Sequence, residues 1–232
     1  MRWQQEEIKV LLPILEQVRA DVGLLEEKYV LVLCSAAGDV VFYLSQGIGR
    51  GKIVGLETND ELLDRARETA EDRGLERLVS FQKAEVNRIA FPDETFDALV
   101  SEFIIFPTPE PTQIGQPEMA RVLKAGGNMV LTDVILSKPI PESVRAAYQS
   151  IGLDYLCDAT VDDFRSWMEE AGLTGVCVLD FTARVRKVWE QRRAIDSVPD
   201  HRSGYAYLLD DTEYGLGEAV FYIHVRGNKP TA

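Results

Sequence analysis

The chain has 232 residues, 46% hydrophobic and 27% charged, so it can bury one sizeable core without a second domain. Its 38 acidic and 25 basic residues give a formal charge of −13, which disfavours a nucleic-acid partner because phosphate binding needs a positive surface. Three widely spaced cysteines, Cys34, Cys157 and Cys177, indicate neither a disulfide framework nor a metal site. No apolar run approaches the ~20 residues that span a bilayer, so we expect a cytoplasmic protein without a membrane partner.

Helical and strand-like segments alternate along the chain. Apolar residues at helical spacing predict a helix over 6–18, with Pro13 as a candidate kink or break. Continuously apolar segments separated by helices indicate a parallel sheet covered on both faces, which is a doubly wound α/β fold. The expected strands are 29–33, 52–56, 79–83, 96–101 and 128–134, and the expected helices end at Gly47, run from Thr58 to Gly74, and lie around 118–123.

Two helix starts have side chains that can cap them. Thr58 and Glu61 have the spacing at which each side chain bonds the other's backbone N–H, and Gly74 is expected to end that helix. Thr160 and Asp163 predict a second start of the same kind.

The last part of the chain predicts two strands, at 175–181 and 219–225, joined by more than thirty residues. A connection of that length is uncommon without structure of its own, so 184–217 is expected to contain a helix and to cover a site or a partner. His224 alternates with apolar neighbours, which predicts packing or surface exposure rather than catalysis.

The loop CSAAGD (34–39) follows the first strand, where a nucleotide-binding fold has its glycine turn. The dinucleotide pattern GxGxxG maps onto Cys34, Ala36 and Asp39, and the acid at Asp39 argues against a pyrophosphate at the helix start. The pattern GxGxG maps onto Cys34, Ala36 and Gly38, which are all small. Glu57 ends the second strand about 20 residues on, where a carboxylate can accept hydrogen bonds from ribose hydroxyls. A solvated surface acid remains the alternative for Glu57.

The chain resembles the class I S-adenosylmethionine-dependent methyltransferases, in particular the small-molecule branch with ubiquinone/menaquinone-type and arsenite-type enzymes. The resemblance rests on VLVLCSAAGDV, IVGLETNDELLDRARE and, most specifically, FPDETFDALVS followed by RVLKAGG. It implies a Rossmann-like seven-stranded sheet, mostly parallel with an antiparallel last strand, and S-adenosylmethionine as cofactor. It also implies one methyltransferase domain over 1–232: an N-terminal helical segment (1–28), a cofactor-binding core (29–134), and a C-terminal part (135–232) with the 184–217 insert.

The resemblance implies which residues hold the cofactor. Glu57 would bind the ribose, and Glu85 would face the adenine amino group. The loop from Cys34 to Gly38 would wrap the methionine moiety. The full implied set lies at strand ends and in the following loops: Cys34, Ser35, Ala36, Gly38, Glu57, Thr58, Asn59, Ala84, Glu85, Val86, Ser101 and Glu102.

Methyl transfer from a sulfonium needs few catalytic side chains, because the methyl carbon is already activated. Glu102 and Asp133 at strand ends are candidates for a general base, with a structural or surface carboxylate as the alternative for each. His201 in the insert is a further candidate. The expected partner is a small-molecule methyl acceptor, with a homodimer left open. The cysteine spacing does not indicate the converging thiolates that arsenite would need.

Departures from the family pattern leave other functions open. The family commonly has an acid at the position of Val32 and glycines at those of Cys34 and Ala36. The added Cβ atoms restrict the loop's backbone angles. The second hypothesis is therefore a methyltransferase-like binding or regulatory protein without catalysis. A nicotinamide-dependent oxidoreductase is the third, and Asp39 disfavours it.

Overall fold

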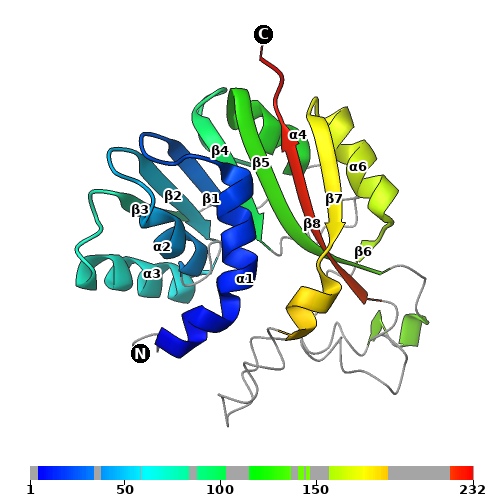
Figure 1. Cartoon of the computed structure of the whole chain (residues 1–232), viewed down its shortest axis with the longest axis horizontal. Helices are drawn as coiled ribbons and strands as arrows, with labels where there is room; N and C mark the ends of the chain where they lie inside the picture. Colours follow the sequence, from blue (N-terminus) through cyan, green and yellow to red (C-terminus); the bar gives the residue numbers. More distant parts are fainter. Residues whose placement is uncertain are drawn as a thin grey trace.

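A mixed β-sheet with helices on both faces makes up the computed structural model (Figure 1). The structure describes residues 5–33, 38–57, 59–83, 88–102, 115–136, 141–143, 145–146, 157–187 and 220–231. The strand order is β3-β2-β1-β4-β5-β8-β7. The strands on this path are β1 (Tyr29–Leu33), β2 (Lys52–Glu57), β3 (Val79–Lys83), β4 (Phe96–Glu102), β5 (Leu123–Leu136), β7 (Thr174–Asp180) and β8 (Val220–Asn228).

The strand directions confirm the predicted seven-stranded sheet with an inserted antiparallel strand. The pairs from β3 through β2, β1 and β4 to β5 are all parallel. Strand β8 runs antiparallel to both of its neighbours, β5 and β7. The sequence did not predict β6 (Cys157–Asp158), a two-residue strand that pairs in parallel with the end of β5.

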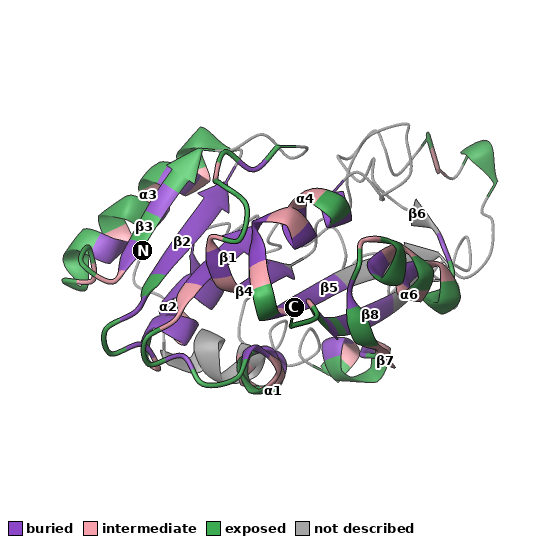
Figure 2. Cartoon of the chain, turned by 90° about the horizontal axis from the view of Figure 1, so that it is seen from above, coloured by how far each residue is buried: buried purple, intermediate pink, exposed green. Residues whose placement is uncertain are grey.

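Alternate residues of each strand supply two apolar layers. On one face Val30 and Val32 pack with α1, α2 and α3, and on the other face Leu31 packs with α4 and α6. Figure 2 shows the buried residues concentrated in the sheet and on the helix sides that cover it. No helix among the described residues has both the length and the apolar character needed to cross a membrane. The helices are α1 (Gln5–Val22), α2 (Asp39–Ser45), α3 (Asp60–Asp72), α4 (Gly115–Val122) and α6 (Val161–Glu170).

Helix α1 is longer than the sequence predicted and is not divided at Pro13. The side chain of Pro13 is exposed, while Leu15, Val18 and Val22 on the opposite side are buried against the sheet. Packing of this apolar face stabilises the helix through the proline, because tertiary contacts supply most of a helix's stability in a protein.

The predicted start of α3 at Thr58 is wrong by one residue. Asn59 is the N-cap, and its side-chain oxygen accepts a hydrogen bond from the Leu62 N–H at 3.1 Å. Asparagine caps at least as well as threonine, and the Asn59 N–H also donates to Glu57 Oε1 at 3.0 Å. Gly74 follows the helix at a φ of 64°, so the predicted end is confirmed.

Helix α6 begins with the predicted capping box. The Thr160 hydroxyl accepts from the Asp163 N–H, and the Asp163 carboxylate accepts from the Thr160 N–H. Phe164 and Met168 are buried on the side that faces β7 and β8. The box therefore fixes the helix where its apolar side can cover the sheet.

The two longest strands extend past their predicted ends. β5 begins at Leu123, because Leu123 pairs with Phe96 before a register shift, and β8 continues to Asn228, which pairs with Asn128. The 184–217 insert was expected to contain a helix. The structure describes a helix over 182–187, which includes the first four residues of the insert, while 188–219 lie outside the described residues.

Candidate functional site

The carboxyl ends of β1, β2 and β4 meet at one edge of the sheet. Leu33, the last residue of β1, pairs with Leu56 of β2 and with Ser101 of β4. The chain goes from β1 to β2 and β3 on one side and returns to β4 on the other, so the strand order reverses beside β1. Open α/β sheets bind ligands outside the carboxyl ends at such a reversal.

Glu57 brings a buried carboxylate to this edge. It is the last residue of β2 and is 5% exposed. Its Oε1 atom accepts the Asn59 N–H, so the carboxylate and the N-cap of α3 hold each other in place. The sequence predicted that Glu57, Asn59 and Ser101 lie near one another, and the structure brings them to the same edge. Ser101 is 3% exposed.

Gly38 is the retained glycine of the loop, and its backbone requires glycine. Its φ is 96°, and it is the N-cap residue of α2. An added Cβ would lie 2.6 Å from Phe42 Cε2 and 3.0 Å from Phe81 Cζ. The loop therefore keeps its glycine where an L residue would be both strained and overlapping.

Replacing Gly38 with alanine is expected to lower the free energy of unfolding by about 3 kcal/mol, because overlap with two aromatic rings adds to the ~1–2 kcal/mol of left-handed strain. Gly74→Ala is the matched control, since Gly74 also has a positive φ but no atom lies within 4 Å of an added Cβ. Its cost should stay near ~1–2 kcal/mol. Urea denaturation measures both values, and equal costs would contradict the packing argument.

Other predicted site residues are only partly described. The backbones of Glu102 and Asp133 lie in β4 and β5, and their side chains are outside the described part. Val32, where the resemblance implies an acid, is fully buried in the apolar layer under α1 and α2. The predicted residues outside the described part are Cys34, Ser35, Ala36, Thr58, Ala84, Glu85, Val86 and His201. Among the described residues no group of acids, histidines and cysteines could hold a metal ion.

His224 is packed, as predicted, but within a polar network that the sequence did not reveal. The imidazole is fully buried and stacks on Phe181 at 4.6 Å. Its Nε2 atom lies 2.7 Å from Asp21 Oδ2 and its Nδ1 atom 3.4 Å from Thr132 Oγ1. Arg226 donates to the other Asp21 oxygen at 2.8 Å. The network fixes α1 to β5 and β8.

Burial and hydrogen bonding set the charges of this network. Burial lowers the pKa of His224 below its ordinary 6.5, although Asp21 acts in the opposite direction. Burial alone would raise the pKa of Asp21, but hydrogen bonds from Gln17, His224 and Arg226 outweigh it and bring the pKa below 3.8. At neutral pH Asp21 is therefore ionised and His224 is neutral, with the proton on Nε2.

The free energy of unfolding is expected to fall as pH drops from about 7.5 to about 5. The folded protein binds the His224 proton less readily than the unfolded chain, whose pKa is near 6.5. This contribution is complete above 6.5 and decreases below it until the lowered pKa is reached. Urea denaturation across this range should show a shallower pH dependence for His224→Gln than for the wild type. Equal slopes would contradict the prediction.

Gln116 is a second buried polar residue that the sequence analysis missed. It is 3% exposed in the first turn of α4, and its Oε1 has no hydrogen-bond partner within the part of the chain that the structure describes. Its neighbours Met119 and Ala120 on the same helix are apolar and buried. Gln116 precedes the expected 118–123 helix by two residues, and its polar side chain three positions before the apolar Met119 was the available sequence signal.

The comparisons with known proteins agree with this geometry. The model of the ubiE/COQ5 methyltransferase family matches residues 15–160. The chain belongs to this family. The resemblance inferred from the sequence is thereby confirmed, and the match covers β1 to β5 and the loops between them.

Two curated relatives and one solved structure are similar to this chain. An arsenite methyltransferase of Halobacterium salinarum is 29% identical over 148 residues, which are 63% of this chain and 37% of that protein. The ubiquinone/menaquinone C-methyltransferase UbiE of Salmonella arizonae is 28% identical over 186 residues, covering 70% of this chain and 73% of that protein. The chain thus spans well under half of the first relative. The cyclase SpnF has the same fold, with a TM-score of 0.75 and 20% identity over 95% of this chain and 82% of that chain.

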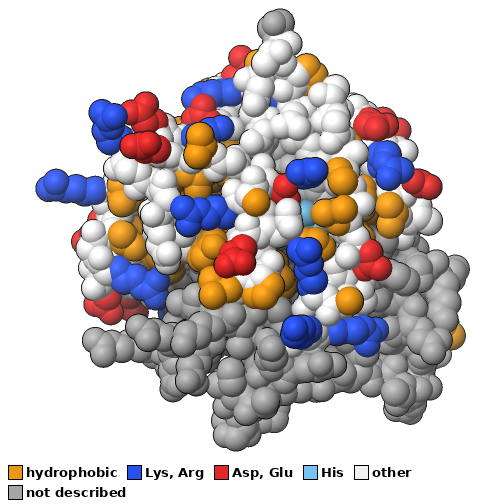
Figure 3. All heavy atoms as spheres, in the orientation of Figure 1, with side chains coloured by type: hydrophobic (Ala, Val, Ile, Leu, Met, Phe, Trp, Pro, Cys, Tyr) orange, Lys and Arg blue, Asp and Glu red, His pale blue; other side chains and the backbone are white. Residues whose placement is uncertain are grey.

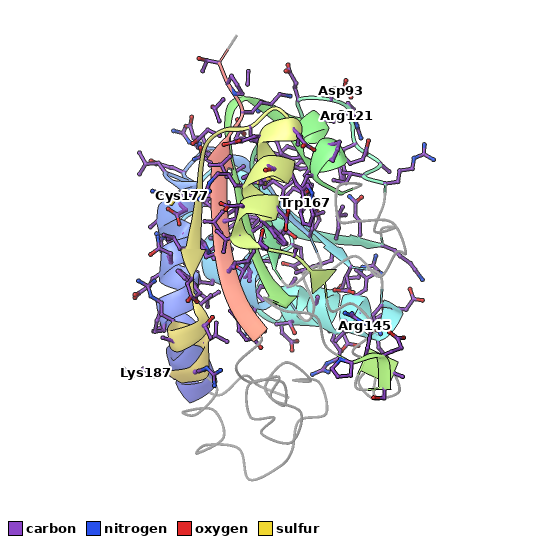
Figure 4. The ribbon with its side chains drawn as sticks, turned by 90° about the vertical axis from the view of Figure 1, so that its right-hand side faces the viewer. Asp93, Arg121, Arg145, Trp167, Cys177 and Lys187 are labelled. Carbon is purple, nitrogen blue, oxygen red and sulfur yellow. The ribbon has the colours of Figure 1, made fainter. Side chains whose placement is uncertain are left out.

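The RVLKAGG motif of this methyltransferase family member has a structural role. Arg121 donates to the carbonyl oxygens of Ile89 and Phe91, and forms ion pairs with Asp93 and Glu118. Figure 4 shows Arg121 and Asp93 together, where α4 ends and β4 begins. Arg121 thus joins the two motifs, because it holds the turn that precedes β4 against α4.

Proposed function

We propose that the protein transfers a methyl group from S-adenosylmethionine to a small organic molecule. The observation that carries the proposal is the buried Glu57 carboxylate at the end of β2, beside the strand reversal, in a member of a methyltransferase family. A carboxylate in this position accepts hydrogen bonds from ribose hydroxyls in Rossmann-like folds. The Asn59 N–H bond holds Glu57 at the required edge.

The remaining cofactor contacts follow from the resemblance. Glu57 would bind the ribose, Thr58 and Asn59 would flank the adenine, and Glu85 would face the adenine amino group. The loop 34–38 and Ser101 would hold the methionine moiety. Bound S-adenosylmethionine would supply a methyl carbon that its positive sulfur activates. The same assignment includes Cys34, Ser35, Ala36, Gly38, Ala84, Val86 and Glu102.

The protein's own task is then to align the acceptor and exclude water. Glu102, the last residue of β4, and Asp133, three residues before the end of β5, are the proposed general bases, with His201 as a further candidate. One relative is named for arsenite and the other for ubiquinone/menaquinone biosynthesis. Cys177 is the one cysteine with a described side chain. It lies half-buried on β7, the outermost strand of the sheet, away from the carboxyl ends of β1, β2 and β4 (Figure 4). An organic acceptor is therefore favoured over arsenite.

The second candidate is a methyltransferase-like binding or regulatory protein without methyl transfer. The observation that favours it is Val32, which is packed among apolar side chains where the family commonly has an acid. The likeness to a cyclase also means that the fold alone does not determine the reaction.

Calorimetric titration with S-adenosylmethionine, S-adenosylhomocysteine and NAD separates these hypotheses. The enzyme hypothesis expects both sulfur nucleotides to bind and NAD not to bind. Methyl transfer is then assayed with a hydroquinone, a phenol, an amine and arsenite as acceptors. Absence of binding at millimolar concentration would sink the methyltransferase proposal, and binding without transfer to any acceptor would support the second candidate.

The proposal also covers the location, the domain organisation and the assembly of the enzyme. We propose a single cytoplasmic domain over 1–232 with a small-molecule acceptor as its partner, and a homodimer as the assembly to test by light scattering. Figure 3 shows acidic and basic side chains interspersed over the described part of the face that carries α1. The formal charge of −13 further disfavours a nucleic-acid partner.

A further inference from the structure

A polar row crosses three neighbouring strands where β4 ends. Glu102, the last residue of β4, pairs with Thr132 of β5, and Thr132 pairs with His224 of β8. Adjacent strands lie ~4.8 Å apart, so the row extends about 10 Å from the carboxyl end of β4 into the sheet. By this register the row lies between the carboxyl end of β4 and the buried network under α1.

Two contacts join the members of this row to a carboxylate. Thr132 is 2% exposed, and its hydroxyl lies 3.4 Å from Nδ1 of the fully buried His224. On the other side of the ring, Nε2 lies 2.7 Å from Asp21. Since Asp21 is ionised, Nε2 carries the proton and Nδ1 offers its lone pair to the Thr132 hydroxyl. Hydroxyl, neutral imidazole and carboxylate thus follow the order in which a hydroxyl proton can pass to an imidazole.

The charges around the imidazole permit this transfer and its reversal. Asp21 of α1 favours the imidazolium, whereas Arg226 of β8 and Arg184 of the 182–187 helix oppose it. Phe181 covers one side of the ring. The imidazole is neutral before the reaction. Asp21 stabilises the imidazolium when a second proton arrives, and the two arginines favour the release of that proton afterwards.

We propose that Thr132, His224 and Asp21 form a relay that takes up the proton released when the acceptor is methylated. This inference rests on the proposed function. The bond from the methyl carbon to the acceptor atom forms, and the carbon–sulfur bond breaks and leaves its electron pair on sulfur. The acceptor's proton enters the row from the carboxyl end of β4 and passes to Thr132 Oγ1, while the Thr132 hydroxyl proton moves to His224 Nδ1. The proton returns to solvent after product release.

The relay defines the class of acceptor. It serves a hydroxyl, an amine or an acidic carbon that must lose a proton on methylation, and it has no use in methylating a proton-free sulfur or tertiary amine. Thr132 is 2% exposed and is not assigned a contact with the acceptor, and His224 and Asp21 act through Thr132, so all three are positioning residues.

The test compares Thr132→Val, which removes the hydroxyl at nearly the same volume, with Thr132→Ser, which retains it. With the acceptor that the wild type methylates, Thr132→Val should lower kcat about 10- to 100-fold, leave the KM for S-adenosylmethionine within about twofold, and alter the acid side of the kcat–pH profile. Thr132→Ser should restore kcat and the acid side of the kcat–pH profile. If Thr132→Val does not fold, Thr132→Ala takes its place.

The matched control is Ser45→Ala. It removes another buried hydroxyl, which donates to the Phe42 carbonyl within its own helix α2, and it should change stability without changing kcat. A second readout does not depend on activity. The chain has two histidines, so nitrogen NMR can assign the His224 ring by comparison with His224→Gln. The wild type should show the Nε2-protonated form, with an Nδ1 shift that changes in Thr132→Val and returns in Thr132→Ser.

The outcomes separate the two proposals. A wild type that methylates no acceptor would overturn the proposed function and the relay with it. An active wild type whose kcat and pH profile are unchanged in Thr132→Val would overturn the relay alone. An Nδ1 shift that is insensitive to Thr132→Val would do the same. Loss of kcat in Thr132→Val, its recovery in Thr132→Ser and the matching Nδ1 shifts would support the relay.

Discussion

Replacing Asp21 with alanine is expected to lower the free energy of unfolding by about 3 kcal/mol, since a hydrogen bond to a charged group is worth ~1.5–3 kcal/mol and a buried donor left without its acceptor adds to the cost. The Asp21 side chain is 3% exposed and bonds both His224 and Arg226. Without it, the buried Nε2–H of the neutral His224 loses its acceptor. Arg226 is half-exposed and can turn to water, so it adds little to the cost. Urea denaturation at neutral pH measures the change.

Two variants isolate the cause. Asp64→Ala removes an aspartate whose ion pair with Arg67 is 3.4 Å long and mostly exposed, and it should cost less than about 0.5 kcal/mol. Asp21→Asn keeps an oxygen that can accept from His224, so its loss of unfolding free energy should lie between those of Asp21→Ala and Asp64→Ala. If Asp21→Ala were as stable as Asp64→Ala, the network would not anchor α1.

Replacing Glu57 with alanine is expected to raise the dissociation constant for S-adenosylhomocysteine about 10- to 150-fold. The variant loses hydrogen bonds to a charged group, which are worth ~1.5–3 kcal/mol. Glu57 is buried at the carboxyl edge, and its Oε1 also accepts the Asn59 N–H, so the turn that would carry the adenine loosens as well. Isothermal titration calorimetry measures the affinity directly.

The controls for Glu57 distinguish a ribose contact from a structural effect. Glu57→Gln retains one acceptor oxygen for the Asn59 N–H and should give an intermediate affinity. Asp60→Ala removes a neighbouring carboxylate that is exposed and paired with Lys83, and it should leave the affinity unchanged. Unchanged binding by Glu57→Ala itself would mean that the ribose lies elsewhere.

Local sequence patterns were sufficient for most of the fold. Apolar strands, such as β1, alternate with helices whose caps lie within a few residues, and this pattern identified the doubly wound sheet. The resemblance, rather than any pattern, gave the inserted antiparallel strand. The spacing of Thr58 and Glu61 favours Thr58 over Asn59 as the cap of α3. Spacing alone does not reveal that the Asn59 N–H bonds Glu57.

The candidate site was predictable only where it follows from strand ends. Glu57 is the last residue of β2 and Ser101 the last but one of β4, so topology brings them to the same edge. The contact of Asp21 with His224 joins positions 203 residues apart, and each residue alone has an ordinary local setting in an amphipathic helix or an apolar strand. Nothing in the spacing of these two residues indicates that they meet, so this network required the three-dimensional structure.

The insertion of β8 between β5 and β7 has a consequence for biosynthesis. Among the described strands β8 leaves the ribosome after all the others, yet it pairs with β5 along nine residue pairs, from Asn128 and Asn228 to Leu136 and Val220. Until β8 has been synthesised, the edge of β5 that it will cover is unpaired and can pair with strands of other molecules. During the same interval Asp21 lacks its contact with His224. The nascent chain therefore completes this sheet only by a late strand insertion.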